Sequence, residues 1–260
     1  MKLRTVVATR YVTPLREGGS LPAIVEADDA GMYVLKFRGA GQGAKVLVAE
    51  IIVGELARAT GLSMPEIAFI ELDPALALTE PDPEIQQLIR ASAGLNLAFD
   101  YLPGSITFDP LADQLDPVLA SSIVWLDAFT SNVDRTPRNA NMLMWHRKLW
   151  LIDHGAALYF HHGWGDGTDR SANPFPAIKD HILLKFASAL DEADAAMMAR
   201  VTPALLQQVV ALVPDAWLAS DKAFAEPARA RDAYVQHLSR RLAAPRAFLE
   251  EAKRARSMLV

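Results

Sequence analysis

The residues best suited to chemistry are two carboxylates and an amide that stand at the ends of short apolar segments. Asp134 and Asn139 lie in the polar stretch 132–141, which follows an apolar segment of helical pattern and precedes a short apolar run. Asp153 follows a second apolar run, and the polar residues 146–148 between the two runs indicate a hairpin. That hairpin would bring Asp153 back towards Asp134 and Asn139. Magnesium is a hard cation that takes oxygen ligands, so the three side chains predict a magnesium site.

A lysine and a glutamate upstream would complete a set of groups for phosphoryl transfer. Lys36 lies in the β-rich apolar run 32–37, where a charge costs free energy unless it has a partner. Glu50 lies in the segment 44–60, whose apolar spacing predicts a helix. Phosphoryl transfer uses magnesium and a lysine to neutralise phosphate oxygens, and a carboxylate to orient the acceptor hydroxyl. Two alternatives stay open: Lys36 extends from an edge strand to solvent, or Glu55 takes the place of Glu50.

The order and spacing of these groups resemble those of a known family. The Asp-x-x-x-x-Asn spacing matches the catalytic loop of protein kinases, and Asp153-His154-Gly155 stands where those enzymes carry Asp-Phe-Gly. From Tyr11 to Phe160 the chain resembles the HipA-like kinases, bacterial relatives of protein and phosphoinositide kinases. Residues 161–260 carry no motif that we can place. The residues that carry the resemblance are Asn132-x-Asp134-Arg135-x-x-x-Asn139, Asp153-x-Gly155, Leu35-Lys36-Phe37 and Glu50-x5-Leu56-Ala57-x3-Gly61-Leu62-x-Met64-Pro65.

The resemblance implies a role for each of the chemical groups. Asp134 would be the catalytic base, and Asn139 and Asp153 would be the magnesium ligands. Lys36, paired with Glu50, would bind phosphate. The implied cofactors are ATP and Mg²⁺. Because the family is best known as the toxin of a toxin–antitoxin pair, an antitoxin-like partner is a further implication.

The resemblance also implies where the nucleotide binds. A glycine-containing turn would cover it, and the backbone at the end of a strand would form the hinge that reads adenine. Glycine pairs are also common in hairpin turns, so the turn by itself is weak evidence. Gly39-x-Gly41-x-Gly43 before the helix 44–60 has two readings, a phosphate-binding loop and a flexible connection. Ser20 would in addition be a site of autophosphorylation. Besides Lys36, the residues expected at the nucleotide are Gly18, Gly19, Ser20, Ala98, Phe99, Asp100 and Tyr101.

The elements that must position these residues predict an α+β protein with a two-lobed protein-kinase-like fold. An N-lobe at 1–102 would hold an antiparallel sheet with one main helix. A mainly helical C-lobe at 103–260 would carry the catalytic loop, the metal-binding hairpin and a helical bundle. The expected strands are 5–13, 22–26, 32–37, 67–72, 95–101, 139–145 and 149–152, and the expected helices include 44–60, 84–93 and 117–131.

Composition narrows the classes of protein that fit. The chain has 260 residues, of which 51% are apolar, so it can bury a sizeable core. A net charge of −5 with interspersed signs argues against a general nucleic-acid or anionic-membrane binder. The absence of cysteine excludes disulfides, thiolate metal sites and cysteine nucleophiles. With no apolar segment suited to a signal peptide or a membrane span, we expect a cytoplasmic protein.

The sequence therefore predicts an ATP- and Mg-dependent phosphotransferase that acts on a hydroxyl, with a HipA-like serine/threonine protein kinase as the leading version. No Ala-Pro-Glu follows Asp153, which keeps a kinase of small molecules or lipid headgroups open as an alternative. A pseudokinase that serves as a binding module is the alternative from another class. A zinc hydrolase built on His154, His161 and His162 is disfavoured, because adjacent loop histidines rarely ligate one ion and no His-x-x-x-His helix occurs.

Overall fold

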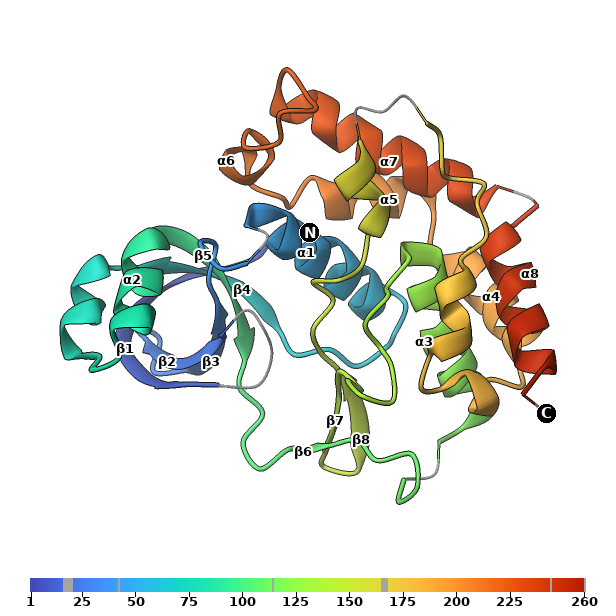
Figure 1. Ribbon diagram of the computed structural model, residues 1–260, viewed down its shortest axis with the longest axis horizontal. Coiled ribbons are helices and arrows are strands. Elements are labelled where there is room, and N and C mark those ends of the chain that lie inside the picture. The colour runs from blue at the N-terminus through green and yellow to red at the C-terminus, as the bar shows by residue number, and fades with distance from the viewer. Residues whose placement is uncertain (16–20, 42, 114, 165–167, 244, 260) are drawn as a thin grey trace. The chain divides into compact units, whose positions relative to one another are not determined.

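The computed structural model describes residues 1–15, 21–41, 43–113, 115–164, 168–243 and 245–259 (Figure 1). The chain divides into two compact units, and each is described by itself. Unit 1 comprises Met1–Val48 and Pro65–Gly104, and unit 2 comprises Ala49–Met64 and Ser105–Val260. Residues 49–64, which the sequence interpretation put in the N-lobe, thus group with unit 2. The assignment of lobes with separate functions stays a prediction.

In the described part of unit 1, the strands close into a barrel in the order β1-β2-β3-β5-β4 (Figure 1). The expected antiparallel sheet needs one correction, because β1 pairs in parallel with β4 through Thr5–Val7 and Phe69–Glu71. The rest of β1 pairs antiparallel with β2, with register shifts between Ala8 and Arg10 and between Tyr11 and Thr13. Such bulges bend and twist a strand, which lets one strand reach two partners and close the sheet. The strands are β1 Thr5–Pro14, β2 Ala23–Ala27, β3 Met32–Lys36, β4 Ile67–Leu72 and β5 Gly94–Asp100.

The interior of this barrel is filled mainly by small and β-branched side chains together with a few large ones, as a narrow barrel requires. Helix α2 (Pro83–Ala91) adds Ile85 and Ile89 to the same core. The 3₁₀ helix η1 (Pro74–Thr79), which the sequence pattern did not predict, adds Ala77. The helices of the barrel core are therefore α2 and η1, and not the single long helix that was expected.

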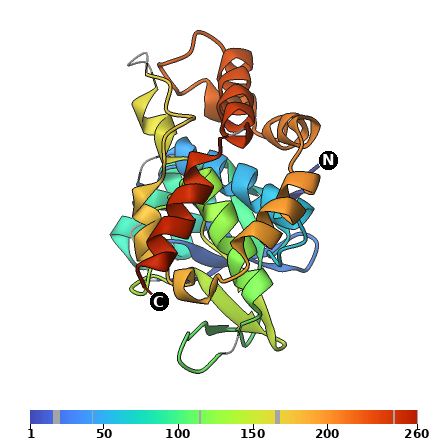
Figure 2. The ribbon, with the colours of Figure 1, turned by 90° about the vertical axis from the view of Figure 1, so that its right-hand side faces the viewer.

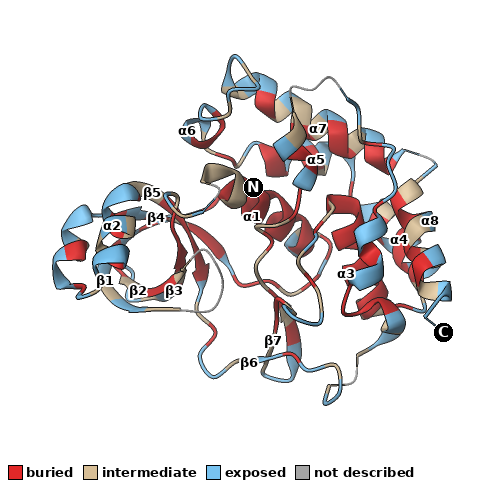
Figure 3. Cartoon of the chain, in the orientation of Figure 1, coloured by how far each residue is buried: buried red, intermediate tan, exposed pale blue. Residues whose placement is uncertain are grey.

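Helix α1 (Ala44–Ala59) runs from unit 1 into unit 2. It ends as its sequence predicts, because Gly61 takes a φ of 88° and the N–H of Leu62 donates back to the carbonyl of Ala57 at 2.9 Å. Such a bond across a left-handed glycine is the Schellman ending of a helix. Most of α1 is buried (Figure 3), so the glutamates that it carries are held inside the protein.

Helix α3 (Pro117–Thr130) is the central element of unit 2. It is apolar on almost every side and its residues from Ser121 onward are nearly all buried, as expected of a helix surrounded by others. Asp116 caps its first turn by accepting from the N–H groups of Val118 and Leu119, both at 2.9 Å. Helices α4, α7 and α8 pack against α3. In Figure 2, α8 is the red helix in the foreground. The C-terminal helices are α4 Leu190–Arg200, α5 Pro203–Val210, α6 Asp215–Leu218, α7 Pro227–Leu242 and α8 Ala247–Ser257.

The predicted hairpin is present as β7 (Met142–Trp145) and β8 (Lys148–Leu151), with the short strand β6 (Ile106–Thr107) beside β7. Its two-residue turn places His146 and Arg147 at φ of 49° and 62°, as a type I′ turn requires. Strand β7 begins later than expected, because residues 139–141 remain in the preceding loop. Three 3₁₀ helices follow, η2 Tyr159–Gly163, η3 Pro176–Asp180 and η4 Leu184–Phe186. Over the described residues, no helix combines the length and apolar character that crossing a bilayer would take.

Candidate active site

The loop that carries Asp134 is shaped by short-range hydrogen bonds. Helix α3 stops at Ser131, whose φ of 55° turns the chain out of the helix. The side-chain oxygen of Asn132 then accepts from the N–H of Asp134 at 3.1 Å. Thr136 and Asn139 exchange two backbone hydrogen bonds of 3.0 Å around a tight turn. Pro137 occupies the turn position that its fixed φ favours. The sequence therefore specifies this loop locally.

The carboxylate of Asp134 is bonded to two asparagine side chains. Its Oδ2 accepts from Nδ2 of Asn139 at 2.7 Å and from Nδ2 of Asn141 at 3.2 Å. Asn141 also donates to the backbone carbonyl of Asp134 at 3.2 Å. The structure thus brings together Asp134 and Asn139, the pair that the sequence motif predicts. It adds Asn141, a second amide that donates to the same carboxylate oxygen.

Asp153 follows strand β8 and lies in a strained backbone conformation. Its φ of 53° is in the left-handed region, which aspartate tolerates better than most residues. The N–H of the preceding Ile152 donates to the carbonyl of Asn141 at 3.0 Å. The segment with Asp153 is therefore joined to the Asp134 loop through Asn141. Strain held at a single polar residue is a feature often found at functional sites.

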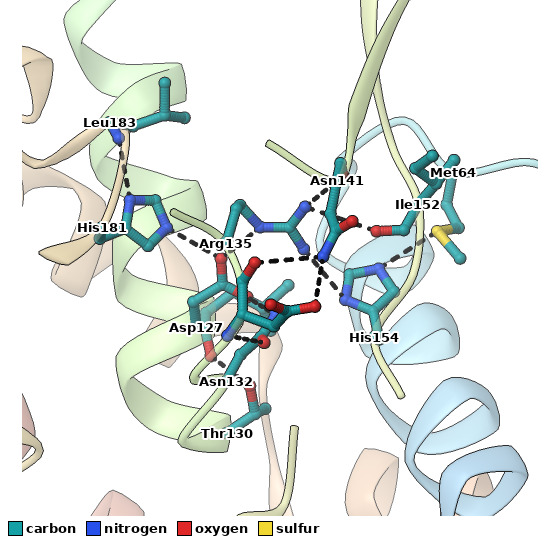
Figure 4. Close-up of polar contacts among 12 residues, drawn as sticks. Met64, Asp127, Thr130, Asn132, Arg135, Asn141, Ile152, His154, His181 and Leu183 are labelled. Atoms are coloured by element: carbon teal, nitrogen blue, oxygen red, sulfur yellow. Dashed lines mark hydrogen bonds and ion pairs between the residues drawn. The ribbon is translucent and has the colours of Figure 1, made fainter. Parts of the chain in front are cut away.

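A buried charge network lies beneath the loop (Figure 4). The carboxylate of Asp127, in α3, accepts from Asn132 at 2.9 Å and from Nε of Arg135 at 2.5 Å. Nε2 of His181 bonds to the same carboxylate at 2.9 Å. Burial alone would raise the pKa of Asp127, but the charge of Arg135 and the hydrogen bond from His181 hold that pKa well below its ordinary value. Asp127 is therefore ionised, and its charge is fully paired inside the protein.

Arg135 extends from Asp127 to the segment around Asp153. Its Nη1 donates to the carbonyl of Asn141 and, at 3.5 Å, to that of Ile152, and its Nη2 contacts Nδ1 of His154 at 3.2 Å. An arginine only donates, so Nδ1 of His154 accepts and the ring is a neutral tautomer with its proton on Nε2. That proton points to the sulfur of Met64 at 3.3 Å. His154 is thus a buried structural partner of Arg135.

Glu50 is fully buried and contacts the same segment. Its Oε2 accepts from the backbone N–H of His154 at 2.9 Å. Glu55, the alternative that the sequence left open, lies 3.6 Å from Arg58 on its own helix. The structure therefore places Glu50, and not Glu55, beside the residue that follows Asp153. The predicted pairing of Glu50 with Lys36 joins the two units and stays a prediction.

Lys36 and the expected hinge lie together in the barrel of unit 1. Lys36 is 7% exposed, and its Nζ lies 5.8 Å from the ring centre of Phe99. The N–H groups of Asp100 and Tyr101 already donate to carbonyls of the protein, at 2.9 and 3.0 Å. An adenine at this strand end would therefore use carbonyl oxygens of Ala98–Tyr101 or other amides nearby. Burial and neighbouring carboxylates raise the pKa of Asp100.

The remaining glycine candidates have different outcomes. Gly18, Gly19 and Ser20 fall outside the described residues. Gly39 donates its N–H to the hydroxyl of Ser92 at 3.0 Å, and a Cβ at that position would lie 2.9 Å from the same hydroxyl oxygen. Gly39 is therefore used for close packing, which favours the connecting role over a phosphate loop.

The histidines that suggested zinc have other partners. His161 is buried, with Nδ1 at 3.0 Å from the hydroxyl of Tyr234 and Nε2 at 3.2 Å from His162. Across the part of the chain that the structure describes, no three histidine, cysteine or acidic side chains gather in a way that would hold a metal. Magnesium needs no such group, since one or two carboxylates and the phosphates of a nucleotide are its usual ligands.

A model of the HipA-like kinase family matches residues 9–250 of the chain. The chain belongs to this family. The resemblance that the sequence motifs carried is thereby confirmed, and it extends to residue 250, into the C-terminal part that had no recognisable motif. A search of curated proteins finds no match.

Solved structures are similar to this HipA-like kinase at low sequence identity. The proinflammatory kinase CtkA of Helicobacter pylori matches with a TM-score of 0.54 and 11% identity, over 99% of each chain. The Golgi casein kinase matches with a TM-score of 0.52 and 11% identity, over 98% of this chain and 72% of its own. The structure of the Golgi casein kinase with Mn/ADP bound matches with a TM-score of 0.51 and 12% identity, over 99% of this chain and 75% of its own. At such identities the likeness shows the fold alone, and that fold is protein-kinase-like.

Sequence reasoning did not single out Asp127 or His181 in this HipA-like kinase. Asp127 is the only charged residue within α3, and a charge inside an apolar helix needs a partner. That signal could have found it. His181 has no local signal, because its contact with Asp127 depends on the tertiary fold.

Proposed function

We propose that the protein is a serine/threonine protein kinase that transfers the γ-phosphate of ATP to a hydroxyl with the help of magnesium. The observation that carries the proposal is the contact of Asp134 with Asn139 and Asn141. A carboxylate oriented by two amides, on a loop anchored by a buried ion pair, is suited to position a hydroxyl. The match to the HipA-like kinase family supports the reaction class.

In the proposed reaction, Asp134 accepts the proton of the acceptor hydroxyl. The hydroxyl oxygen forms the new bond to the γ-phosphorus as the bond to the β-phosphate oxygen breaks, and ADP leaves. Asn139 and Asn141 hold the carboxylate, so that little reorganisation is needed when the hydroxyl arrives. Lys36, held in the barrel wall, would neutralise phosphate oxygens, and the backbone of Ala98–Tyr101 would contact adenine.

The residues present fit a magnesium ion. Asp153 offers a carboxylate, and Asn139 directs its amide nitrogen at Asp134, which leaves the amide oxygen as a ligand atom. We propose Asp153 and Asn139 as the ligands. Such an ion, when bound, neutralises charge on the β- and γ-phosphates. A structural relative, the Golgi casein kinase, has been solved with Mn/ADP bound, which supports a nucleotide and a divalent cation here.

The test is phosphate transfer from labelled ATP to a panel of serine and threonine peptides, small alcohols and lipid headgroups. In Asp134→Asn the transfer rate should fall by about a thousandfold, because the base is lost. Nucleotide affinity should change little. Asp232→Asn, an exposed aspartate on α7, is the matched control and should keep full activity. Undiminished transfer in Asp134→Asn would refute the role of Asp134, and labelling of only alcohols or lipids would refute the protein acceptor.

Ser20 is proposed as a site of autophosphorylation, and an antitoxin-like protein as a partner, both on the strength of the family. Phosphopeptide mapping after incubation with ATP tests the first. Phosphate found only at other residues would exclude Ser20.

A further inference from the structure

His181 lies in the part of the chain for which the sequence offered no motif. It follows η3 and its side chain is almost wholly buried. Its Nδ1 accepts from the backbone N–H of Leu183 at 3.0 Å. A ring nitrogen that accepts carries no proton, so Nε2 carries it and donates to Oδ2 of Asp127 at 2.9 Å. Both ring nitrogens are thus committed, which fixes the orientation of the ring.

The same short segment holds Arg135 in two ways. His181 and Nε of Arg135 bond to the same oxygen, Oδ2 of Asp127, so the histidine helps to set the angle at which the carboxylate meets the guanidinium (Figure 4). In addition, the N–H of Ile182 donates to the carbonyl of Arg135 at 3.1 Å. Asp134 is the residue next to Arg135, so its backbone is anchored at the same point.

Arg135 in turn relates the two segments that bear the proposed chemical groups. Its guanidinium contacts the carbonyls of Asn141 and Ile152 and the ring of His154. Asn141 is a hydrogen-bond donor to Asp134, and Ile152 and His154 stand on either side of Asp153. The guanidinium is planar and its donors have fixed directions, so its orientation determines how these segments are spaced.

We propose that His181 is a positioning residue for phosphoryl transfer: by fixing Asp127, it orients Arg135 and thereby sets the placement of Asp134 relative to Asp153. This inference rests on the proposed function for its catalytic consequence. Its structural part concerns only residues of unit 2.

Amide hydrogen exchange tests the structural part without any activity. In His181→Leu, peptides covering 132–141 and 150–155 should exchange about tenfold faster, as the loss of a hydrogen bond to a charged group allows. His237→Leu is the matched control, because His237 is a buried histidine of the same unit that lies outside the network and stacks on Phe160. It should leave these peptides unchanged. Unchanged exchange in folded His181→Leu would overturn the proposal.

Two further variants separate the two ring contacts if His181→Leu fails to fold. In His181→Gln, the amide nitrogen replaces Nε2 and can still donate to Asp127. In His181→Asn, the amide oxygen replaces Nδ1 and can still accept from Leu183, but Asp127 is out of reach. The proposal requires His181→Gln to resemble the wild type more closely than His181→Asn does, both in exchange and in transfer rate. The reverse order would overturn it.

Kinetics test the catalytic part. The transfer rate at saturating ATP should fall about tenfold to a hundredfold in His181→Asn, with nucleotide KM nearly unchanged, because small misplacements of reacting groups have effects of that size. His181→Gln should recover most of the rate. A wild type that transfers no phosphate would refute the proposed function, while exchange still tests the positioning. An active wild type with equally active His181→Asn would refute the positioning role alone.

Discussion

The backbone N–H of His154 donates to the carboxylate of Glu50 at 2.9 Å, and both groups are fully buried. Helix α1 is thereby bonded to the residue that follows Asp153. The glutamate was expected from its spacing to be the partner of a lysine. The structure gives Glu50 a second role, because its bond to His154 fixes the backbone next to Asp153, the proposed metal ligand.

Glu50→Ala should therefore destabilise the fold by about 2–4 kcal/mol, because it leaves a buried N–H of His154 without its acceptor. Glu50→Gln retains an acceptor oxygen and should cost less. Urea unfolding followed by circular dichroism measures both. Glu250→Ala, at an exposed glutamate of helix α8 that lies 3.2 Å from Lys253, is the control and should cost no more than about 1 kcal/mol. An equal or larger loss in the control would contradict this account of Glu50.

Asp153→Gly should separate stability from ligand binding. Glycine adopts a φ of 53° without strain, which offsets part of the stability lost with the side chain, so the variant should still fold and unfold cooperatively. The loss of its carboxylate should abolish the magnesium-dependent part of nucleotide binding. In the wild type, ATP with magnesium at a hundred times its dissociation constant should add about 2.7 kcal/mol, or roughly 5–10 °C in Tm. Thermal unfolding with ATP, with and without magnesium, measures this. A full magnesium-dependent shift in Asp153→Gly would exclude the metal role.

Arg241 stabilises the end of the helix that leads into the catalytic loop. It is 4% exposed, and its guanidinium donates to the carbonyls of Ala128 and Phe129 in α3 and to those of Ser171 and Asn173. Burial lowers its pKa to about 10, so the side chain remains charged at neutral pH. A cation at the C-terminus of a helix is favourable, and here it also satisfies four carbonyls.

Arg241→Met should cost about 3–5 kcal/mol, since those buried carbonyls lose their donors. Arg241→Lys keeps the charge but loses the planar set of guanidinium donors, so its unfolding free energy should lie between those of Arg241→Met and the wild type. The matched control is Arg240→Met, which removes an exposed arginine paired with Asp169 and should cost less than about 1 kcal/mol. Chemical denaturation ranks the variants, and similar values for positions 240 and 241 would contradict this role.

His237 should make the fold sensitive to mild acid. Burial, together with the charges of Arg241 and Arg240 and against that of Asp169, lowers its pKa to about 4. The folded state keeps the ring neutral, whereas the unfolded chain takes up a proton below its ordinary pKa of about 6.5. The contribution is therefore complete above pH about 6.5 and is lost as the pH falls towards 4, to a total of about 3 kcal/mol.

Unfolding free energies measured from pH 7 to pH 4 test this pH dependence. His237→Phe, which can still stack on Phe160, should flatten the decline. His146→Phe, at an exposed histidine of the hairpin turn, should not. An unchanged slope in His237→Phe would assign the acid sensitivity to other groups. The buried His181, whose pKa is also lowered by burial, is the first of these.

The sequence predicted those parts of the molecule that local patterns determine. The strand 67–72 and the hairpin around His146 are observed as predicted, and Asp134 contacts Asn139 as its motif indicates. The late start of β7 was not predicted. Asn141 stays in the loop because its carbonyl accepts from Arg135 and its amide donates to Asp134, and these contacts have no signal in the local sequence.

Longer-range features could not be predicted from the sequence. The closure of the barrel depends on bulges in β1, which have no reliable sequence signal. The contact between Asp127 and His181 joins parts of the chain that only the folded helices bring together. The hydrogen bonds of Arg135 therefore could not be predicted from the sequence, although the arginine itself belongs to the motif.

The closed barrel also limits how another chain could attach to unit 1. Strand β1 bonds to β2 on one side and to β4 on the other, so the described strands of this unit leave no open edge. An extended peptide cannot add itself there as one more strand. The sheet of unit 2 differs, since β6 lies at its border and Ile106 is 66% exposed. A partner that binds by strand addition would therefore meet an available border in the β6–β8 sheet.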